Sequence, residues 1–405
     1  MTGEELIRNL GGWEGYRPVS VKIMGDHQVR IELLPDDIQG ICDSCGRVCR
    51  QVHDTQKRWV RDLPIFDYSV RLWVHRRRML CPYCGPKLER LGWLERSSRQ
   101  TARLAESVAR WCKVATVKHV AQQYGLNRKT VKQIDKRYLK RQLGPVDLSR
   151  VRLLAMDEFA IQKGHRYATV IVDPTCKQVL WIGRGRGRAD VRPFFEQLGR
   201  AGCRRIEAVA MDMNAGYDVE VKAQCPNARV VFDLYHVVAK YNRQVTDRVR
   251  VDEANRLRED KPARKIVKSS RWLLLKNRSN LPEDQAVRLE ELLAANESLL
   301  HVYLLKDDLK ELWEFTSGQE KQAYRFWLEW FRRAIQSGLA PLMKFARGLR
   351  KYIPDILNHC RYPLHTGLLE GMNNKIKVIK RMAYGYRDDE YFFLKIRQAF
   401  PGNGT

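Results

Sequence analysis

The 405-residue sequence lacks the features that would place it in a membrane or outside the cell. No apolar run approaches the roughly 18 residues that a membrane-spanning helix needs, and the first residues do not read as a secretory signal. Internal repeats and low-complexity tracts are also absent. We therefore expect a protein of two to four globular domains in the reducing cytoplasm.

Acidic residues are scarce relative to basic ones. There are 47 Asp and Glu against 74 Lys and Arg, which gives a formal net charge of +27. Such an excess indicates a polyanionic partner, and nucleic acid is favoured because basic side chains that neutralise phosphates release counterions. A basic protein at a membrane surface is the alternative. The apolar fraction of 44% is ordinary, so sizeable cores can form.

Nucleotide-binding motifs are missing as well. The stretch "GRGRGR" at 183–188 has neither the Lys-Ser/Thr of a phosphate-binding loop nor the spacing of a dinucleotide fingerprint. A basic turn that contacts DNA explains it better. We therefore expect no nucleotide cofactor.

The ten cysteines do not suggest a disulfide scaffold in a chain of this length. Two CxxC pairs stand out instead, in "CDSCG" at 42–46 and "CPYCG" at 81–85. Four thiolates suit tetrahedral Zn²⁺ and leave no open position, so the predicted zinc is structural. The predicted ligands are Cys42, Cys45, Cys81 and Cys84. Cys49 and His53 lie nearby and are expected not to be ligands.

A helix-turn-helix pattern follows at about 97–142. Ala121, Gly125, Val131 and Ile134 fall where the motif needs a small residue, a turn glycine and two core residues. The second helix, predicted at about 128–141, begins with side-chain types that contact bases and phosphates in a major groove. The predicted DNA-binding residues are Arg128, Lys129, Thr130, Lys132 and Gln133. A plain core helix pair is the alternative.

Strands and helices alternate between 151 and 240. Predicted strands are 151–159, 166–173, 177–183, 206–212 and 228–233, with helices between the third and fourth and between the fourth and fifth. Three consecutive strands followed by helix, strand, helix, strand is the order of a ribonuclease H-like α/β domain with one mixed sheet.

The whole chain is therefore predicted to be a multidomain α+β protein. Its predicted parts are a zinc ribbon (1–95), a helix-turn-helix (96–148), the first part of the catalytic domain (149–244), an all-helical insertion (245–360) and the last part of the catalytic domain (361–405).

Asp157 and Asp212 end the first and fourth predicted strands. These strands are neighbours in the inferred fold, so the two carboxylates should converge at one edge of the sheet. Their charges would repel unless a cation shares them, and hard oxygen ligands suit Mg²⁺ or Mn²⁺. Glu370 in "HTGLLEGMNNKIK" is the best third carboxylate. Such a two-metal site serves phosphodiester chemistry.

Other acids near this edge are weaker candidates. Asp233 ends the fifth strand in "VVFDLYHVV", with His236 three residues later, and it competes with Asp212. We favour Asp212 because the fifth strand lies further from the first; Asp233 and His236 would then support the site. Glu158 should face the other side of the sheet, and Asp173 reads as a turn residue.

At these residues the sequence resembles insertion-sequence transposases with an Asp-Asp-Glu site, and more closely the ISL-three group. The matching pieces are "CDSCG…CPYCG", "MDEFAIQKGHRYATVIVD", "AVAMDMNAGYDVEV", "CPNARVVFDLYHVV" and "LEGMNNKIKVIKRMAYGYRD". The resemblance implies that Asp157, Asp212 and Glu370 are the catalytic acids and that a helical segment interrupts the catalytic fold.

The same resemblance implies a bacterial, nucleoid-associated enzyme that cuts at terminal inverted repeats. It also implies transfer of the freed 3′-ends to target DNA by a dimer or a larger assembly on paired ends. Two other functions remain open: a zinc and helix-turn-helix DNA-binding protein without activity, which the intact acid set disfavours, and another ribonuclease H-like nuclease, which would usually lack the zinc ribbon and the insertion.

Overall fold

The computed structural model describes residues 7, 11–25, 27–162, 164, 166–364 and 367–402, apart from the side chain of Leu368. The chain divides into two compact units. The first comprises Met1–Gly144 with Met382–Tyr384, and the second comprises Pro145–Arg381 with Gly385–Thr405. The domain boundaries inferred from the sequence remain a prediction.

The first unit contains a sheet with the strand order β1-β2-β6-β5, and β7 pairs with the end of β6. The strands are β1 (Tyr16–Met24), β2 (Gln28–Pro35), β5 (Val52–Ile65), β6 (Tyr68–Cys81) and β7 (Gly85–Leu88), with a small ribbon of β3 (Gly40–Ile41) and β4 (Val48–Cys49). Alternating residues of β2 and β6 face the core, among them Ile31, Leu33, Leu72 and Val74.

Three helices follow the sheet: α2 (Ala102–Trp111), α3 (Val117–Tyr124) and α4 (Arg128–Leu143). Ala121, Val131 and Ile134 are buried in their shared core, as the motif predicts. Gly125 ends α3 with a φ of 56°, a left-handed conformation that glycine adopts without strain. Asn127 then caps α4 by accepting a hydrogen bond from the Lys129 backbone N–H.

The second unit is built on a five-stranded mixed sheet with the order β10-β9-β8-β11-β12. The strands are β8 (Leu153–Gln162), β9 (Arg166–Asp173), β10 (Gln178–Arg184), β11 (Ala208–Met211) and β12 (Arg229–Phe232). The first three are antiparallel, whereas β11 is parallel to both β8 and β12. The expected adjacency of the first and fourth strands is confirmed.

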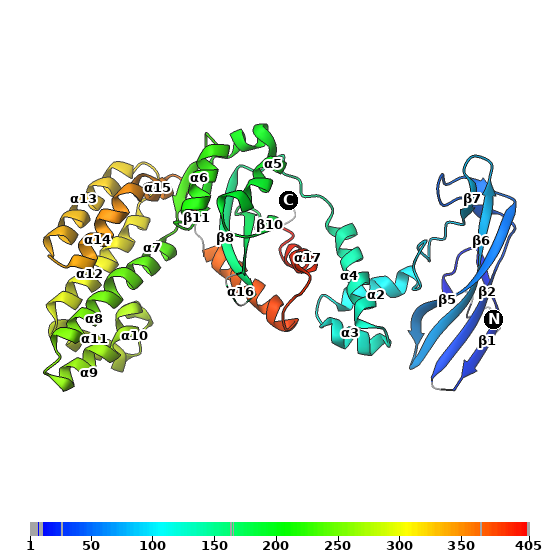
Figure 1. Cartoon of the computed structure of the whole chain (residues 1–405), viewed down its shortest axis with the longest axis horizontal. Helices are drawn as coiled ribbons and strands as arrows, with labels where there is room; N and C mark the ends of the chain where they lie inside the picture. The colour runs from blue at the N-terminus through cyan, green and yellow to red at the C-terminus, as the bar shows by residue number, and fades with distance from the viewer. Residues whose placement is uncertain are drawn as a thin grey trace. The chain divides into compact units, whose positions relative to one another are not determined.

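Helices cover both faces of this sheet (Figure 1). Leu154, Met156, Val209 and Met211 share a core with α5 (Arg188–Arg205) and α6 (Ala215–Gln224). The alternate residues, such as Ala155 and Ala210, pack against α16 (Gly367–Met382) and α17 (Asp389–Ala399). Odd positions of β8 and even positions of β11 therefore point toward α16, because successive side chains on a strand alternate in direction.

From Leu234 to Cys360 the described chain is helical. Its elements are α7 (Leu234–Tyr241), a π-helical turn (Asn242–Thr246), α8 (Asp247–Arg256), α9 (Lys261–Ser269), α10 (Arg271–Leu275), α11 (Glu283–Ala294), α12 (Glu297–Glu311), α13 (Glu320–Gln336), α14 (Ala340–Leu349) and α15 (Ile353–Leu357), with short 3₁₀ turns. Trp330 and Phe345 are buried in the core shared with the sheet. The structure thus confirms helical character between the fifth strand and Glu370.

None of the helices among the described residues is long and apolar enough to cross a membrane.

Candidate catalytic and metal-binding sites

Asp157 lies in the middle of β8, which corrects the prediction that it ends a strand. The strand continues to Gln162 because its other edge pairs with β9 as far as Arg166. The parallel partner β11 pairs with β8 only up to Ala155 and ends at Met211. Asp212 follows directly after this end. Both aspartates therefore lie where β11 stops. By strand alternation, both also occupy positions whose side chains point toward α16.

The two aspartates interact electrostatically. Burial raises the pKa of Asp157 to about 6, and the negative charge of Asp212 contributes to this rise. Burial likewise raises the pKa of Asp212 above its ordinary value. The positive charge of a protonated His236 acts in the opposite direction on both carboxyl groups. The structure therefore brings Asp157 and Asp212 into one electrostatic cluster, with Glu158 and His236 close enough to affect both pKa values.

Asn373 also contacts this site, although no motif in the sequence pointed to it. Its Nδ2 donates a hydrogen bond of 2.6 Å to Oδ2 of Asp157, across 216 positions of sequence. Oδ1 of Asp157 accepts from the backbone N–H of Glu158 at 2.7 Å. Oδ1 of Asn373 is buried and has no hydrogen-bond partner in the described structure. The amide is thus fixed by Asp157 on one side and has a free acceptor on the other.

Glu370 lies in the first turn of α16, one helical turn before Asn373. Residues three apart on a helix are neighbours on its surface. Leu369, Met372 and Ile376 of the same helix are buried against the sheet, so the helix is packed over the face that carries Asp157. Glu370 itself is exposed. Among the described residues, only the four cysteines form a group of three or more His, Cys, Asp or Glu side chains placed to hold a metal ion, and Glu370 does not join the two aspartates in such a group.

Asp233 and His236 lie beyond β12, as predicted. Asp233 is buried and precedes α7, and its Oδ2 has no hydrogen-bond partner among the described residues. His236 Nε2 lies 4.0 Å from that oxygen. Because His236 influences both Asp157 and Asp212, this pair borders the aspartate cluster rather than forming a separate site.

The arginines of the "GRGRGR" stretch are engaged in ion pairs. Arg184 pairs with Asp389, Arg186 with Glu158, and Arg188 with Glu220. Arg186 also lies over the ring of Tyr167, at 4.2 Å from its centroid. Glu158 thus points away from α16, as expected, and its negative charge still raises the pKa values of Asp157 and Asp212. Asp173 accepts bonds from Thr175 in a turn, also as expected.

The four predicted zinc ligands form a cluster. The Sγ atoms of Cys42, Cys45, Cys81 and Cys84 all lie within 4.8 Å of one another. Gly46 and Gly85 have φ angles of 74° and 68°, so each knuckle turn uses the left-handed freedom of glycine. His53 pairs with Asp54 instead, and Cys49 is buried beside the cluster without belonging to it.

The close packing of these four cysteines favours a bound cation. Backbone N–H groups, first that of Tyr83, lower the pKa of the Cys81 thiol to about 6. Hydrogen bonding with Cys45, burial and hydrogen bonding with Cys81 raise the pKa of the Cys84 thiol to about 12. Four thiolates this close repel one another unless a divalent ion shares them. The donor set and its spacing are those of a closed tetrahedral zinc site.

The predicted DNA-binding side chains lie at the start of α4. Arg128, Lys129 and Gln133 are exposed, whereas Thr130 and Lys132 are partly buried. The helix buries Val131 and Ile134 on its other side, so these residues occupy the face that a major groove can accept.

Comparison with protein families agrees with this arrangement. A family model described as "Transposase", for the DDE transposases of the ISL3 family, matches residues 154–396, which is more than half of the chain. The chain belongs to the ISL3 family of transposases. Residues 89–139 match the helix-turn-helix domain of this family, and residues 39–84 match the zinc finger of the transposases of IS204, IS1001, IS1096 and IS1165.

Curated relatives extend over the same length. The transposase for insertion sequence element IS1001 of Bordetella parapertussis is 53% identical over 406 residues and is covered completely, as is this chain. The transposase for IS1557 of Mycobacterium tuberculosis is 27% identical over 374 residues, or 86% of this chain and 83% of the relative. The predicted transposase function is confirmed, with a helix-turn-helix and a zinc ribbon beside the DDE transposase region.

Proposed function

We propose that this transposase cuts DNA at the terminal inverted repeats of its insertion sequence and joins the freed 3′-ends to target DNA. The catalytic residues in this proposal are Asp157, Asp212 and Glu370, in a domain with a ribonuclease H-like fold. The strand order β10-β9-β8-β11-β12, with helices on both faces, supports that fold. The hydrogen bond from Asn373 to Asp157 carries the proposal, because it joins the helix of Glu370 to the first aspartate.

The residues present fit a divalent cation. Asp157 is buried and Asp212 is partly buried, their negative charges repel each other, and hard oxygen donors of this kind suit Mg²⁺ or Mn²⁺. Bound there, such ions would activate the attacking oxygen and stabilise the charge on the leaving oxygen. The buried Oδ2 of Asp233, which accepts no hydrogen bond from the described residues, offers a further acceptor near His236.

The chain's own side chains would prepare this chemistry. Asn373 holds the Asp157 carboxylate in one orientation through its Nδ2, and the Glu158 backbone N–H fixes the second oxygen. The Asn214 backbone N–H does the same for Oδ1 of Asp212, at 3.1 Å. His236 adds positive charge beside both aspartates when it is protonated. Fixed carboxylates reduce the reorganisation needed in the transition state.

Recognition of the DNA ends is assigned to the first unit. The exposed residues at the start of α4 would enter the major groove, and the four-cysteine cluster would hold structural Zn²⁺ in the same unit. Two DNA ends must be handled together, so we propose a dimer or a larger assembly on paired ends.

The test is cleavage of DNA that carries the ends flanking the transposase gene. Purified full-length protein should nick at the repeat boundary with Mg²⁺ and not with EDTA. Asp157→Asn keeps the size of the side chain and should bind the same DNA without cutting it. Specific binding without any cut by the wild-type protein, with either Mg²⁺ or Mn²⁺, would reject the catalytic proposal. Loss of binding in Asp157→Asn would assign Asp157 a folding role instead.

A further inference from the structure

The outward face of the first unit's sheet carries a row of cations. Residues that pair directly across strands point to the same face, and the pairs Lys22–Arg30, Arg30–Arg71 and Arg71–Arg61 connect β1, β2, β6 and β5. Lys22, Arg30 and Arg71 are exposed, and Arg61 is partly buried. Four strands spaced about 4.8 Å apart give the row a length of roughly 14 Å.

No described acid neutralises the positive charge of this row. Arg61 and Arg71 are directly opposite, an arrangement that destabilises a sheet when no anion separates the charges. Burial and the nearby charge of Arg71 both lower the pKa of Arg61. Within the described residues no carboxylate pairs with Lys22, Arg30 or Arg71, and Nε of Arg61 is buried without an acceptor. An anion bound along the row would relieve these repulsions.

Two tryptophans form the next row on the same face. Trp59 and Trp73 pair across β5 and β6, with ring centroids 4.6 Å apart, and Trp59 is 42% exposed. The guanidinium of Arg30 lies 5.6 Å from the centre of the Trp59 ring. The acidic side chain of this row, Glu32, is bonded to His75 at 2.7 Å. Phosphate-binding cations therefore lie beside an exposed aromatic surface.

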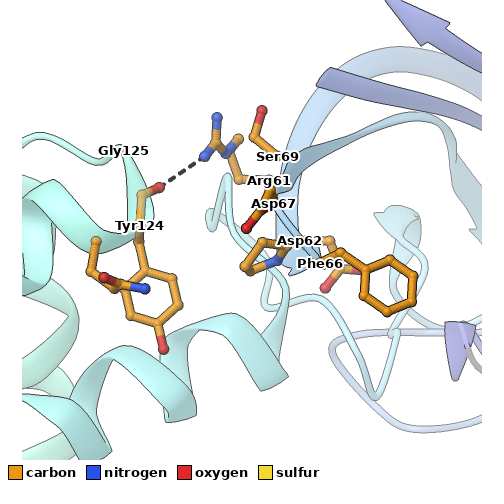
Figure 2. Close-up of a pocket in the computed structure, with 9 residues that line it drawn as sticks. Arg61, Asp62, Phe66, Asp67, Ser69, Tyr124 and Gly125 are labelled. Atoms are coloured by element: carbon orange, nitrogen blue, oxygen red, sulfur yellow. Dashed lines mark hydrogen bonds between the residues drawn. The ribbon is translucent and has the colours of Figure 1, made fainter. Parts of the chain in front are cut away.

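The row ends at the turn of the helix-turn-helix. Arg61 donates a hydrogen bond of 2.9 Å to the carbonyl oxygen of Tyr124, as Figure 2 shows. A cavity of about 300 Å³ separates the end of the sheet from this turn, with Arg61, Asp67 and Ser69 on the strand side and Tyr124 and Gly125 on the helix side. The cation row therefore ends near the start of α4, which begins three residues after Gly125, and Asp62 and Asp67 also line the cavity.

We propose that this face, defined by Lys22, Arg30, Arg61, Arg71, Trp59 and Trp73, binds single-stranded DNA. Cations alone would serve a duplex backbone equally well. The tryptophans favour a single strand, because unpaired bases can stack on an aromatic ring whereas bases inside a duplex are already stacked. The inference rests on the proposed function in one respect: cleavage next to a bound repeat leaves a free strand end, and separation of this end from its complement is the source of the unpaired DNA.

The test measures binding of full-length protein to labelled oligo-dT of about 12 nucleotides, a length that suits one stacking surface. Trp59→Ala should weaken binding about tenfold, and Trp59→Phe should retain most of it, since a ring is preserved. Arg71→Ala should weaken binding and reduce the slope of log K against log salt by about 0.7, the value for one phosphate contact on a single strand. Trp272→Ala, at a tryptophan that is 65% exposed on α10, is the matched control.

Three results would overturn the inference. One is wild-type affinity for oligo-dT in both Trp59→Ala and Arg71→Ala. Another is an equal loss in Trp272→Ala. The third is a loss of affinity for duplex repeat DNA in Trp59→Ala and Arg71→Ala that equals their loss of affinity for oligo-dT. Such a loss would indicate a duplex contact or misfolding, and the zinc content of each variant distinguishes these two. Failure of the proposed function differs from all three: the wild-type protein would then bind oligo-dT through this face but would not cut its ends.

Discussion

The side-chain amide of Asn373 donates to the carboxylate of Asp157 at 2.6 Å, and this bond joins a helix near the C-terminus to the central strand of the mixed sheet. Through it, the position of Glu370 on α16 is coupled to the orientation of Asp157. The more than 100 residues between β12 and α16, which are largely helical where described, do not prevent this contact.

Asn373→Ala should lower the rate of DNA cleavage by about 10- to 100-fold with little change in end binding. The reason is that Asp157 would lose the group that fixes Oδ2 while its own carboxylate remains. Single-turnover nicking and a binding assay on the same DNA measure the two effects. Asn374→Ala is the control, because this neighbouring residue is exposed on the same helix. Equal rates for both variants would show that the bond to Asp157 is not used.

Asp212→Ala should abolish cleavage, whereas Asp233→Ala should leave measurable activity. Asp212 shares the electrostatic cluster with Asp157, and Asp233 borders it next to His236. Nicking rates of both variants with Mg²⁺ provide the comparison, and Asp173→Ala, in a turn, serves as control. A more severe defect in Asp233→Ala than in Asp212→Ala would reverse the assignment of the second metal ligand.

Cys81→Ser should release the zinc and weaken recognition of the DNA ends. The Cys81 thiol has its pKa lowered to about 6 and is a ready thiolate ligand. Zinc content by mass spectrometry should fall from about one ion per chain to well below one. Cys176→Ser is the control, since Cys176 lies in the turn between β9 and β10. Full zinc occupancy in Cys81→Ser would exclude the four-cysteine site.

Lys129→Ala and Gln133→Ala should weaken end binding in different ways. A phosphate contact by Lys129 predicts a weaker affinity for every sequence and a salt slope smaller by about 1. A base contact by Gln133 predicts a loss of about 1–3 kcal/mol on the cognate repeat alone, with relaxed specificity at one base pair. Lys113→Ala, at an exposed residue between α2 and α3, is the control. The same loss on random DNA in both variants would contradict the base contact.

Glu220→Gln should destabilise the second unit at neutral pH. The Glu220 side chain is fully buried, and hydrogen bonds from Arg192 and then Arg188 lower its pKa to about 2. Because this pKa is below the unfolded value of 4.5, the stabilisation is present above about pH 4.5 and is lost as the pH falls toward 2.

We expect the free energy of unfolding of Glu220→Gln to be about 1–3 kcal/mol lower than that of the wild type at pH 7. The loss is limited because the two arginines are half exposed and solvent weakens their charges. Urea unfolding of the wild type and the variant at pH 7, 5 and 3.5 should show that the difference between their free energies of unfolding becomes smaller as the pH falls. Glu196→Gln, at an exposed residue of the adjacent helix α5, should unfold as the wild type does. A difference that is constant with pH would mean that packing, and not the charge of Glu220, is responsible.

Local patterns in the sequence predicted the parts of the molecule that depend on local chemistry. The CxxC spacing predicted the cysteine cluster, and Gly125 with Ala121 and Val131 predicted the helix-turn-helix. The order of strands was sufficient to place Asp157 beside Asp212. The predicted end of β8 was wrong, because the length of this strand depends on its pairing with β9.

Features that need pairing between distant strands could not be predicted in this way. The cation row requires that β2 pairs in parallel with β6, which no short pattern indicates. Asn373 offered a weak signal, since it follows Glu370 by one helical turn, but its partner is 216 positions away. The alternation that identified each strand does not determine which strands become neighbours.

The central claim is that Asp157, Asp212 and Glu370, carried by three separate elements, hold the same divalent metal ions. The most direct measurement is a titration of the full-length protein on its end DNA with Mn²⁺, followed by electron paramagnetic resonance of the free ion. Our account predicts that Asp157→Ala, Asp212→Ala and Glu370→Ala each lose Mn²⁺ binding while Asp173→Ala retains it. Wild-type Mn²⁺ binding in Glu370→Ala, with DNA binding intact, would contradict it.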